Sequence, residues 1–312
     1  MKERFVHQEF AAKSMVLINQ ANQILAEYAA QGYRLTLRQV YYQFVARALL
    51  ENNQKNYKRL GDVINNGRMC GLIDWNYIED RGRETVFVPH WDNPADIIDS
   101  AAASFRIDKW EDQPWYVEVQ VEKQALEGIL IPVCRQLDIG FCANRGYSSS
   151  SALYETGKRL QEKIDGGKDI LILYLGDHDP SGIDMTRDVR ERLQLFARSR
   201  IKTVRLALNM DQIEQYNPPE NFAKTTDSRY SQYTDQFGER SWELDALEPR
   251  VLAGLVTAAV EEVRDDDLYN AAVEREREMR ATLKQYAADY RIKNGNGRHQ
   301  PDEEEDEEED EE

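Results

Sequence analysis

Cysteine, long apolar runs and a hydrophobic leader are scarce or absent in this chain of 312 residues. Its three cysteines, Cys70, Cys134 and Cys142, have neither the paired spacing of a disulfide framework nor the spacing of a metal site, so we expect reduced thiols in a cytoplasmic protein. No apolar run reaches about 18 residues, which predicts that no helix crosses a membrane. The first ten residues are polar, which argues against a signal peptide.

Basic residues are outnumbered by acids, 40 to 57, and the net charge of −17 at first argues against a nucleic-acid partner. However, Pro301–Glu312 holds eleven acids and no base, so the remaining chain carries only −6. Nucleic acid therefore stays open as a partner. We predict a disordered acidic tail over residues 293–312, because like charges repel and bury nothing. Such a tail either solubilises the chain or mimics phosphate and limits non-specific binding.

The N-terminal third has the pattern of three helices followed by a small hairpin. Apolar residues recur at helical spacing from about Gln8 to Ala30, Thr36 and Gln39 form a capping box that opens a helix to about Leu50, and a third helix spans Gln54 to Cys70. Strand-like segments at residues 77–80 and 84–88 flank a basic turn with Arg81 and Arg83. This order predicts a winged helix-turn-helix domain over residues 1–110.

From residue 111 the pattern alternates between strands and helices. Strands are predicted at Trp115–Val121, Asp138–Ala143, Asp169–Leu175 and Lys202–Leu208, and helices at Glu122–Gln136, Ser149–Ile164, Gly182–Ser199 and Glu248–Val263. The alternation predicts an α/β domain, a parallel sheet flanked by helices, over residues 111–292 with C-terminal helices. Within it, Tyr216–Ser241 is predicted to be an extended loop.

Two aspartates follow the third predicted strand. Asp177 and Asp179 come directly after the buried run Ile170–Leu175, and Glu122 follows the first strand. Because parallel strands end at one edge of a sheet, all three carboxylates are expected there, where α/β sheets place their chemistry. Such oxygens suit Mg²⁺, and a carboxylate not bound to metal can act as a general acid or base. An Asp-x-Asp pair alone is more typical of a solvated turn, so the prediction depends on Glu122.

A tyrosine pair lies on the second predicted helix. Leu37, Val40, Tyr41, Phe44 and Ala48 form one apolar stripe, and Tyr42 lies about 100° further round. Arg38 is four residues before Tyr42 and so on the same face. We predict Tyr42 as a nucleophile toward a phosphodiester, with Arg38 favouring the phenolate and gripping the phosphate. The tyrosine pair by itself is more typical of amphipathic packing.

Basic residues supply candidate contacts to DNA. Lys55, Lys58 and Arg59 lie opposite the apolar face of the third helix, and Arg145 precedes a helix N-terminus that suits a phosphate. A solvated helix face and an ordinary serine N-cap are the alternatives.

Taken together and in this order, these motifs resemble the A subunit of topoisomerase VI and the related meiotic double-strand-break protein. Arg38-Gln39-Val40-Tyr41-Tyr42 matches the family motif Arg-x-x-Tyr-Tyr, Arg145-Gly146-Tyr147 resembles its Gly-Tyr loop, and Trp242–Leu247 resembles a late segment. The resemblance covers about Leu35 to Val263. It departs at Gln39, where the family often has an acid, in the short N-terminus and in the acidic tail.

The resemblance implies a Toprim domain in which Glu122, Asp177 and Asp179 hold Mg²⁺, with Mn²⁺ able to substitute. It also implies that Arg38 orients the scissile phosphate, that Glu122 takes part in catalysis, and that Tyr42 attacks in the metal site of a second protomer. Double-stranded DNA would be cut with 5′-phosphotyrosyl linkage, as in type IIB topoisomerases, by a homodimer that a separate ATPase B-type subunit would assist. No membrane is expected, and the location would be cytoplasmic and nucleoid-associated in a bacterial, phage or mobile-element host.

Three other functions stay open. A Toprim nuclease would hydrolyse DNA or RNA with water, and Tyr42 would then only support structure or contact the backbone. A non-catalytic DNA-binding or assembly protein would use the metal site structurally. A phosphatase with an Asp-x-Asp nucleophile is the weakest reading, because Pro180 follows where such motifs continue to Thr or Val.

Overall fold

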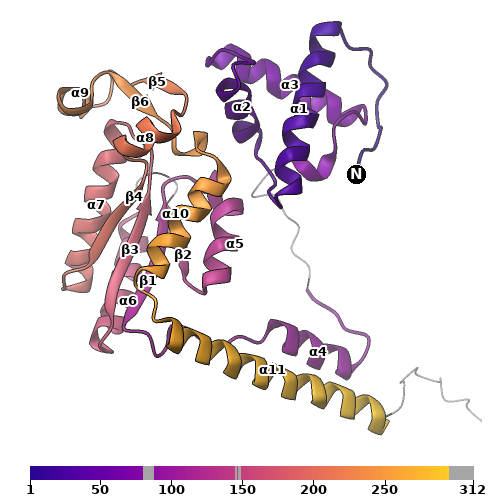
Figure 1. Cartoon of the computed structure of the whole chain (residues 1–312), viewed down its shortest axis with the longest axis vertical. Coiled ribbons are helices and arrows are strands. Elements are labelled where there is room, and N and C mark those ends of the chain that lie inside the picture. Colours follow the sequence, from indigo (N-terminus) through magenta and orange to yellow (C-terminus); the bar gives the residue numbers. More distant parts are fainter. Residues whose placement is uncertain (80–87, 145, 147–148, 295–312) are drawn as a thin grey trace, which may run out of the picture. The chain divides into compact units, whose positions relative to one another are not determined.

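The computed structural model of the protein describes residues 1–79, 88–144, 146 and 149–294. These residues form two compact units. The first contains the described residues up to 79 together with Trp110–Asp265, and the second combines residues 88–109 with residues 266–294. All the strands of the sheet belong to the first unit (Figure 1).

Three helices open the first unit, as predicted: α1 (Ala12–Ala30), α2 (Leu37–Ala46) and α3 (Gln54–Met69). The predicted capping box is confirmed, since Thr36 Oγ1 accepts the Gln39 N–H at 3.3 Å and Gln39 Oε1 accepts the Thr36 N–H at 2.8 Å. The apolar faces of the three helices meet in one core. The short helix η1 (Trp75–Tyr77) follows, and most of the predicted hairpin lies outside the described residues.

The predicted parallel sheet is confirmed. Its strands are β1 (Trp115–Val121), β2 (Gly140–Ala143), β3 (Asp169–Leu175) and β4 (Lys202–Ala207), in the order β2-β1-β3-β4. The register pairs Val121 with Leu175, Leu175 with Ala207 and Val121 with Ala143, so the four carboxyl ends are level. After its first residue, β3 is buried throughout, which explains its unbroken apolar run.

Helices cover both faces of the sheet, as predicted (Figure 1). On one face α6 (Ser150–Asp165) and α7 (Pro180–Ala197) share a core with Ile170, Ile172 and Tyr174 of β3. On the other, α5 (Glu127–Leu137), which follows the short helix η2 (Gln124–Leu126), packs against α10 (Pro249–Glu261). The fold class is therefore α/β, with the sheet ends left open for the loops that carry the predicted site.

The prediction of an extended loop over Tyr216–Ser241 is wrong. After α8 (Met210–Tyr216), this region forms β5 (Glu220–Phe222), α9 (Tyr230–Phe237) and β6 (Arg240–Trp242), and β5 and β6 pair antiparallel. Strands of three residues are too short to show a period of two in the sequence. They are fixed instead by long-range bonds, since the backbones of His178 and Trp242 exchange two hydrogen bonds of 2.9 Å.

The second unit is a pair of helices, α4 (Pro94–Ser104) and α11 (Asp266–Asn294). Helix α4 lies where the sequence suggested only a connection, although Asn93 as N-cap and Pro94 at the first position are helix-start signals. The units thus differ from the predicted ranges 1–110 and 111–292, because α11 packs on α4. The predicted acidic tail lies almost wholly outside the described residues.

One buried carboxylate organises this helix pair. Glu276 of α11 accepts hydrogen bonds from Lys109 Nζ at 2.8 Å and the Ile107 N–H at 3.2 Å, and it also pairs with Arg280. Burial alone would raise the pKa of Glu276, but these hydrogen bonds outweigh burial and lower the pKa. The ionised form is therefore bound more strongly in the folded unit than in the unfolded chain.

We predict that Glu276→Ala loosens the helix pair by about 3–5 kcal/mol, because it removes the buried carboxylate to which Lys109, Arg280 and the Ile107 N–H all bond. Amide exchange in α4 and α11 should accelerate, whereas exchange in β1 and β3 should not change. Glu274→Ala, on an exposed position of the same helix, is the control. A stability difference between wild type and Glu276→Gln should shrink as the pH falls below about 4.3, through the lowered folded pKa. Equal exchange in wild type and Glu276→Ala would contradict this account.

Candidate functional site

The carboxyl ends of β1 and β3 bring two predicted site residues together. Glu122 follows β1 and Asp177 lies two residues after β3, and the Asp177 N–H donates to Glu122 Oε2 at 3.0 Å. Both side chains are buried. The loop after β2 also reaches this point, since the Gly146 N–H donates to the Glu122 carbonyl at 3.1 Å.

Asp179 has a structural role that its motif partly explains. It caps α7, accepting the Gly182 N–H at 2.6 Å and the Ser181 hydroxyl at 3.1 Å, and Pro180 occupies the first helical position. Gly182 is required here, because a Cβ atom on it would come within 2.2 Å of the Asp177 carbonyl oxygen. Asp-x-Asp-Pro-x-Gly is thus a strand-to-helix turn that also presents carboxylates.

His178, between the two aspartates, is directed into an aromatic cluster. Its Nδ1 lies 2.8 Å from the Tyr233 hydroxyl, and its ring packs edge-on against Phe237 and Trp242. Burial, with a smaller effect of Arg205, lowers the pKa of His178 to about 4. The imidazole is therefore neutral at pH 7 and anchors the turn on the β5–β6 hairpin.

Arg205, on β4, fixes the backbone of the same turn. Its guanidinium donates to the carbonyls of Gly176, Asp177 and Gly182 at 2.6–3.0 Å. Sequence reasoning missed this residue, because an arginine in a strand gives no sign that it will reach a neighbouring loop.

A largely buried lysine lies at the centre of the acidic residues. Lys123 Nζ lies 2.8 Å from Asp177 Oδ1 and 3.0 Å from Asp245 Oδ1, and it also pairs with Glu243. Burial alone would lower the pKa of Lys123, but these three carboxylates raise it well above its usual value. The Leu244 N–H also donates to Asp177 Oδ1 at 2.8 Å, so the segment after β6 is held directly against Asp177.

Arg38 extends this ionic cluster to α2. Its guanidinium lies 2.8 Å from Glu243 Oε2 and 3.1 Å from Asp245 Oδ2, and it donates to the Tyr42 hydroxyl at 3.3 Å. We predicted Arg38 and Tyr42 as neighbours, and the structure places them so. Glu243 and Asp245 received no role from the sequence, although an acid pair two residues apart was visible beside Trp242.

Tyr42 is more enclosed than its helical position suggested. It was expected outside the apolar stripe, yet it is only 5% exposed, because the short helix η3 (Leu244–Ala246) packs against α2. Burial raises the pKa of Tyr42 to about 12, with Glu243 and Asp245 adding to the rise. Arg38 opposes the shift, as expected, but does not outweigh it. The phenol is therefore protonated at pH 7.

One cavity of about 540 Å³ joins the tyrosine to the sheet-edge acids. Its walls combine Tyr42 and Arg38 of α2 with carboxylates that follow β3 and β6, including Asp177, Asp179 and Glu243. Asn52, Lys224 and Trp242 also line it. A phenol, a guanidinium, a lysine, amides and carboxylates thus face one space that a phosphate-bearing ligand could enter.

The same residues could hold a metal ion. Asp177, Glu243 and Asp245 each offer a carboxylate oxygen, and these oxygens lie within 4.8 Å of one another. The predicted set of Glu122, Asp177 and Asp179 does not form such a group among the described residues. The three carboxylates that come together are oxygen donors of the kind a hard divalent cation prefers.

The charges of the site leave room for such a cation. The pKa of Asp177 is raised to about 8, chiefly by burial and also by Glu122, Glu243 and Asp245, against the opposing effect of Lys123. The pKa of Glu122 is also raised, chiefly by burial. Lys123 already contacts all three carboxylates of this group, so a divalent cation would bind beside its ammonium group or replace it, and would favour the ionised form of Asp177.

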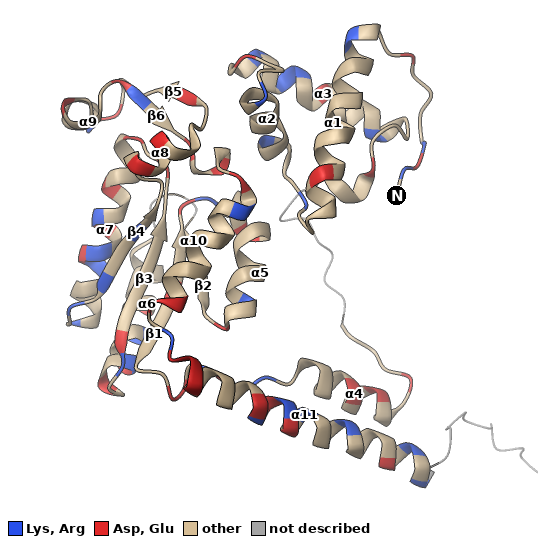
Figure 2. Ribbon diagram, in the orientation of Figure 1, with Lys and Arg blue, Asp and Glu red and all other residues tan. Residues whose placement is uncertain are grey.

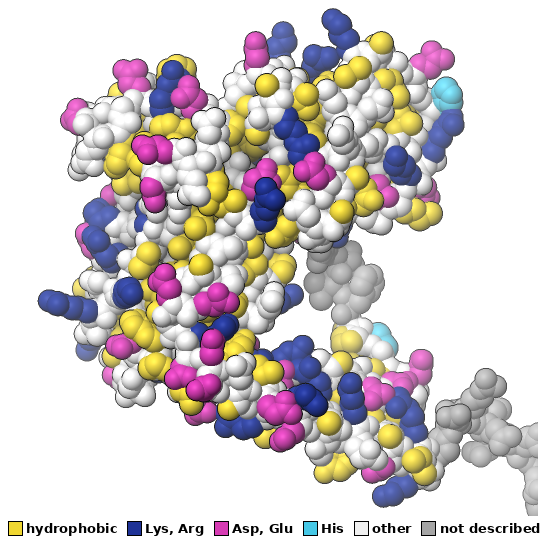
Figure 3. Space-filling model, in the orientation of Figure 1, with side chains coloured by type: hydrophobic (Ala, Val, Ile, Leu, Met, Phe, Trp, Pro, Cys, Tyr) yellow, Lys and Arg dark blue, Asp and Glu magenta, His cyan; other side chains and the backbone are white. Residues whose placement is uncertain are grey.

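The predicted DNA contacts are only partly described. Lys55, Lys58 and Arg59 are exposed on α3, opposite its buried apolar face. Arg81, Arg83 and Arg145 lie outside the described residues. On the face drawn in Figure 3, basic and acidic side chains are interspersed.

Compared with known protein families, with curated proteins and with solved structures, the chain gives no match. Within the described residues, none of the helices combines the length and apolarity that crossing a bilayer requires.

We predict that Asp245→Asn destabilises the first unit by about 3–5 kcal/mol, because this fully buried carboxylate pairs with both Lys123 and Arg38. The free energy of unfolding in urea measures the effect. Asp235→Asn, on an exposed position of α9, is the matched control and should change stability by less than about 0.5 kcal/mol. Equal effects of the two substitutions would show that the ionic cluster does not hold this unit together.

Proposed function

We propose that this protein cleaves double-stranded DNA by tyrosine transesterification, with Tyr42 as nucleophile and a divalent cation as cofactor. The proposal includes a winged-helix reading of the three N-terminal helices and a Toprim reading of the four-stranded sheet, as the resemblance implies. The observation that carries it is the shared cavity, in which Tyr42 and Arg38 meet Asp177 and Asp179 from a distant part of the chain. A tyrosine used only for packing would not need an arginine at its hydroxyl in a cavity lined by carboxylates.

In the proposed step, the Tyr42 hydroxyl gives up its proton to a carboxylate or to water as Oη attacks the scissile phosphorus, the bond from phosphorus to O3′ breaks, and O3′ takes up one proton in return. The 5′ phosphate remains on Tyr42, so the phosphotyrosyl bond can be reversed by the 3′ hydroxyl. Mg²⁺, or Mn²⁺ in its place, would be held by Asp177 with Glu243, Asp245 or Asp179, and would neutralise charge on the phosphoryl group. Lys123 keeps these carboxylates in place, and Glu122, which is not among these ligands and whose pKa is raised chiefly by burial, is suited to exchange a proton.

Tyr42 must become more accessible before it can attack. Its hydroxyl is bonded to Arg38, and Arg38 is bonded to Glu243 and Asp245. If a DNA phosphate replaces these carboxylates as the partner of Arg38, the negative charge near the phenol moves onto the substrate. Substrate binding and exposure of the nucleophile would then be one event.

A second function is favoured by one observation, the enclosure of Tyr42. A buried phenol with a pKa of about 12 is a poor nucleophile at neutral pH, whereas a water molecule at the same carboxylates would have no such barrier. A Toprim nuclease that hydrolyses DNA or RNA is therefore the alternative. In that case Tyr42 and Arg38 would close the wall of the cavity.

Supercoiled plasmid incubated with Mg²⁺ or Mn²⁺ and quenched with detergent separates the two functions. We predict protein covalently attached to 5′ ends, lost in Tyr42→Phe and in Asp177→Ala. Tyr154→Phe, an exposed tyrosine on α6, should retain the adduct. Cleavage that survives Tyr42→Phe but not Asp177→Ala would instead establish hydrolysis. Repeating the assay with a separate ATPase B-type subunit would test whether cleavage needs that partner. The proposed homodimer would be tested by the mass of the protein in solution.

Metal binding can be measured without activity. We predict that the protein binds Mn²⁺, detected by the loss of the free-ion electron paramagnetic resonance signal, and that Asp177→Asn weakens binding at least tenfold. Asp169→Asn, at the opposite end of the same strand, is the control. Equal Mn²⁺ affinity in all three proteins would exclude Asp177 as a ligand.

A further inference from the structure

The helix pair of the second unit has a very small core. Its fully buried side chains, among the described residues, are four alanines and Glu276: Ala95, Ala102, Ala272, Ala287 and Glu276. Alanine burial contributes little, since hydrophobic stabilisation scales with buried apolar area. Two helices joined by so few apolar contacts need a further layer to cover what they leave exposed.

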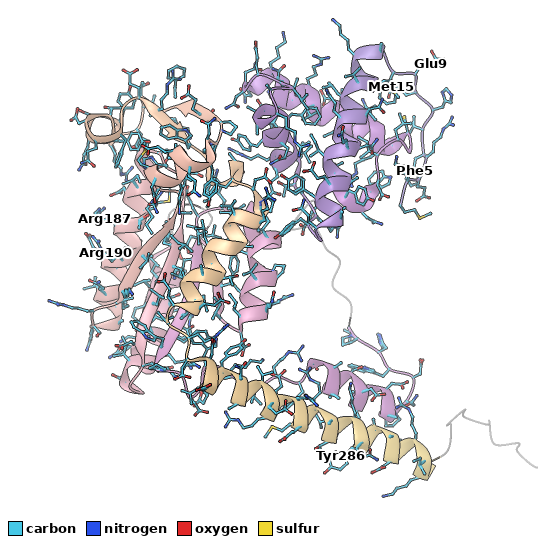
Figure 4. All side chains as sticks on the ribbon, viewed as in Figure 1. Phe5, Glu9, Met15, Arg187, Arg190 and Tyr286 are labelled. Atoms are coloured by element: carbon cyan, nitrogen blue, oxygen red, sulfur yellow. The ribbon has the colours of Figure 1, made fainter. Side chains whose placement is uncertain are left out.

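Four large apolar side chains in a row on helix α11 are exposed to solvent over a third or more of their surface. Leu268, Met279, Tyr286 and Tyr290 are 38%, 50%, 60% and 37% exposed. At 100° per residue these four positions lie within about 40° of one another around the helix axis. They form one stripe about 33 Å long, beside the face that packs on α4. Tyr286, labelled in Figure 4, projects from the helix into solvent.

We infer that this stripe pairs α11 with α11 of a second copy of the chain, in antiparallel orientation about a two-fold axis at Met279. The two ends of the stripe are symmetric about that residue, because Leu268 and Tyr290 each lie eleven positions from Met279, whereas Tyr286 is matched by the small residue Ala272. In an antiparallel pair, Leu268 of one copy therefore meets Tyr290 of the other, and the two Met279 side chains meet on the axis. A self-complementary surface of this kind is what a two-fold dimer requires.

The charges of α11 favour the same arrangement. Asp266–Met279 carries five acids and two bases, a net charge of −3, whereas Arg280–Asn294 carries four bases and one acid, a net charge of +3. Figure 2 shows acids at the start of α11 and bases towards its end. Antiparallel pairing sets the acidic half of one helix against the basic half of the other, whereas parallel pairing would set like charges together. Arg291 also bonds to Asp96 and Asp99 of α4, so it contributes least to this attraction.

Antiparallel pairing also aligns the helix dipoles favourably, with each N-terminus beside the partner's C-terminus. Together with α4 of each copy, the result is a four-helix arrangement whose centre is the stripe. The inference does not depend on DNA cleavage, because mass alone reports the dimer. A monomer that still formed a covalent adduct would overturn the interface without touching the proposed chemistry.

Sedimentation velocity and light scattering of the full chain, over a range of concentrations, test the interface. We expect a species of twice the 36.2 kDa monomer mass. Met279→Glu should weaken dimerisation at least tenfold, because the two-fold axis brings the two new carboxylates together. Ala281→Glu adds the same charge to the opposite side of the helix, about 200° away, and should leave the dimer intact. Unchanged helical circular dichroism would establish that both variants fold.

A cross-linking experiment checks the register. Met279→Cys should form an intermolecular disulfide under mild oxidation, whereas Ala281→Cys should not. A monomer at every concentration would overturn the inference, as would a dimer that survives Met279→Glu. Equal loss in both glutamate variants, or cross-linking at position 281 instead of 279, would overturn the assigned stripe.

Discussion

The ion pairs of Lys123 with three carboxylates are the interactions on which the site depends. The ammonium group is largely buried just after β1. Its three carboxylate partners come from the turn after β3 and from the segment after β6. A charge taken out of water is costly unless its partners are close and well placed. The segment Trp242–Leu247 is therefore held against the sheet edge, and Arg38 continues the same network to α2 through Glu243 and Asp245.

This network also sets the electrostatics of the cavity. Replacing a buried ion pair by apolar side chains often costs nothing, whereas removing one partner of the pair is strongly destabilising. A core built only for stability would thus have no need of several acids around one lysine. Here burial raises the pKa of Asp177 to about 8, with Glu122, Glu243 and Asp245 adding to the rise, and strongly shifted acids cluster at functional sites. A divalent cation bound at these carboxylates would favour the ionised form of Asp177.

Local patterns predicted the frame of the site, because they depend on neighbours in the sequence. The apolar run of β3, the capping box at Thr36 and the acids that follow β1 and β3 are all of this kind. Glu243 and Asp245 lie about 120 residues from Lys123, and no periodicity links such positions. The enclosure of Tyr42 was missed for the same reason, since η3 and not α2 itself covers it. Helix α4 could have been predicted from local signals. Asn93 and Pro94 are typical of a helix start, but the segment was interpreted as a connection.

The proposed cleavage of both DNA strands would need two tyrosines and therefore two copies of the chain. The position of Tyr42 bears on which copy would supply the metal site for each tyrosine. The resemblance implies attack in a partner's metal site, whereas here Tyr42 shares a cavity with the acids of its own chain. Helix α2 shares a core with α1 and α3, so attack in a partner's site would require the three-helix bundle to exchange as a whole. Arg38 would then bond to Glu243 and Asp245 of the other copy, as in domain swapping. The balance between the two states would be set by whatever holds two copies close together, since a tethered partner raises the effective concentration of the second site.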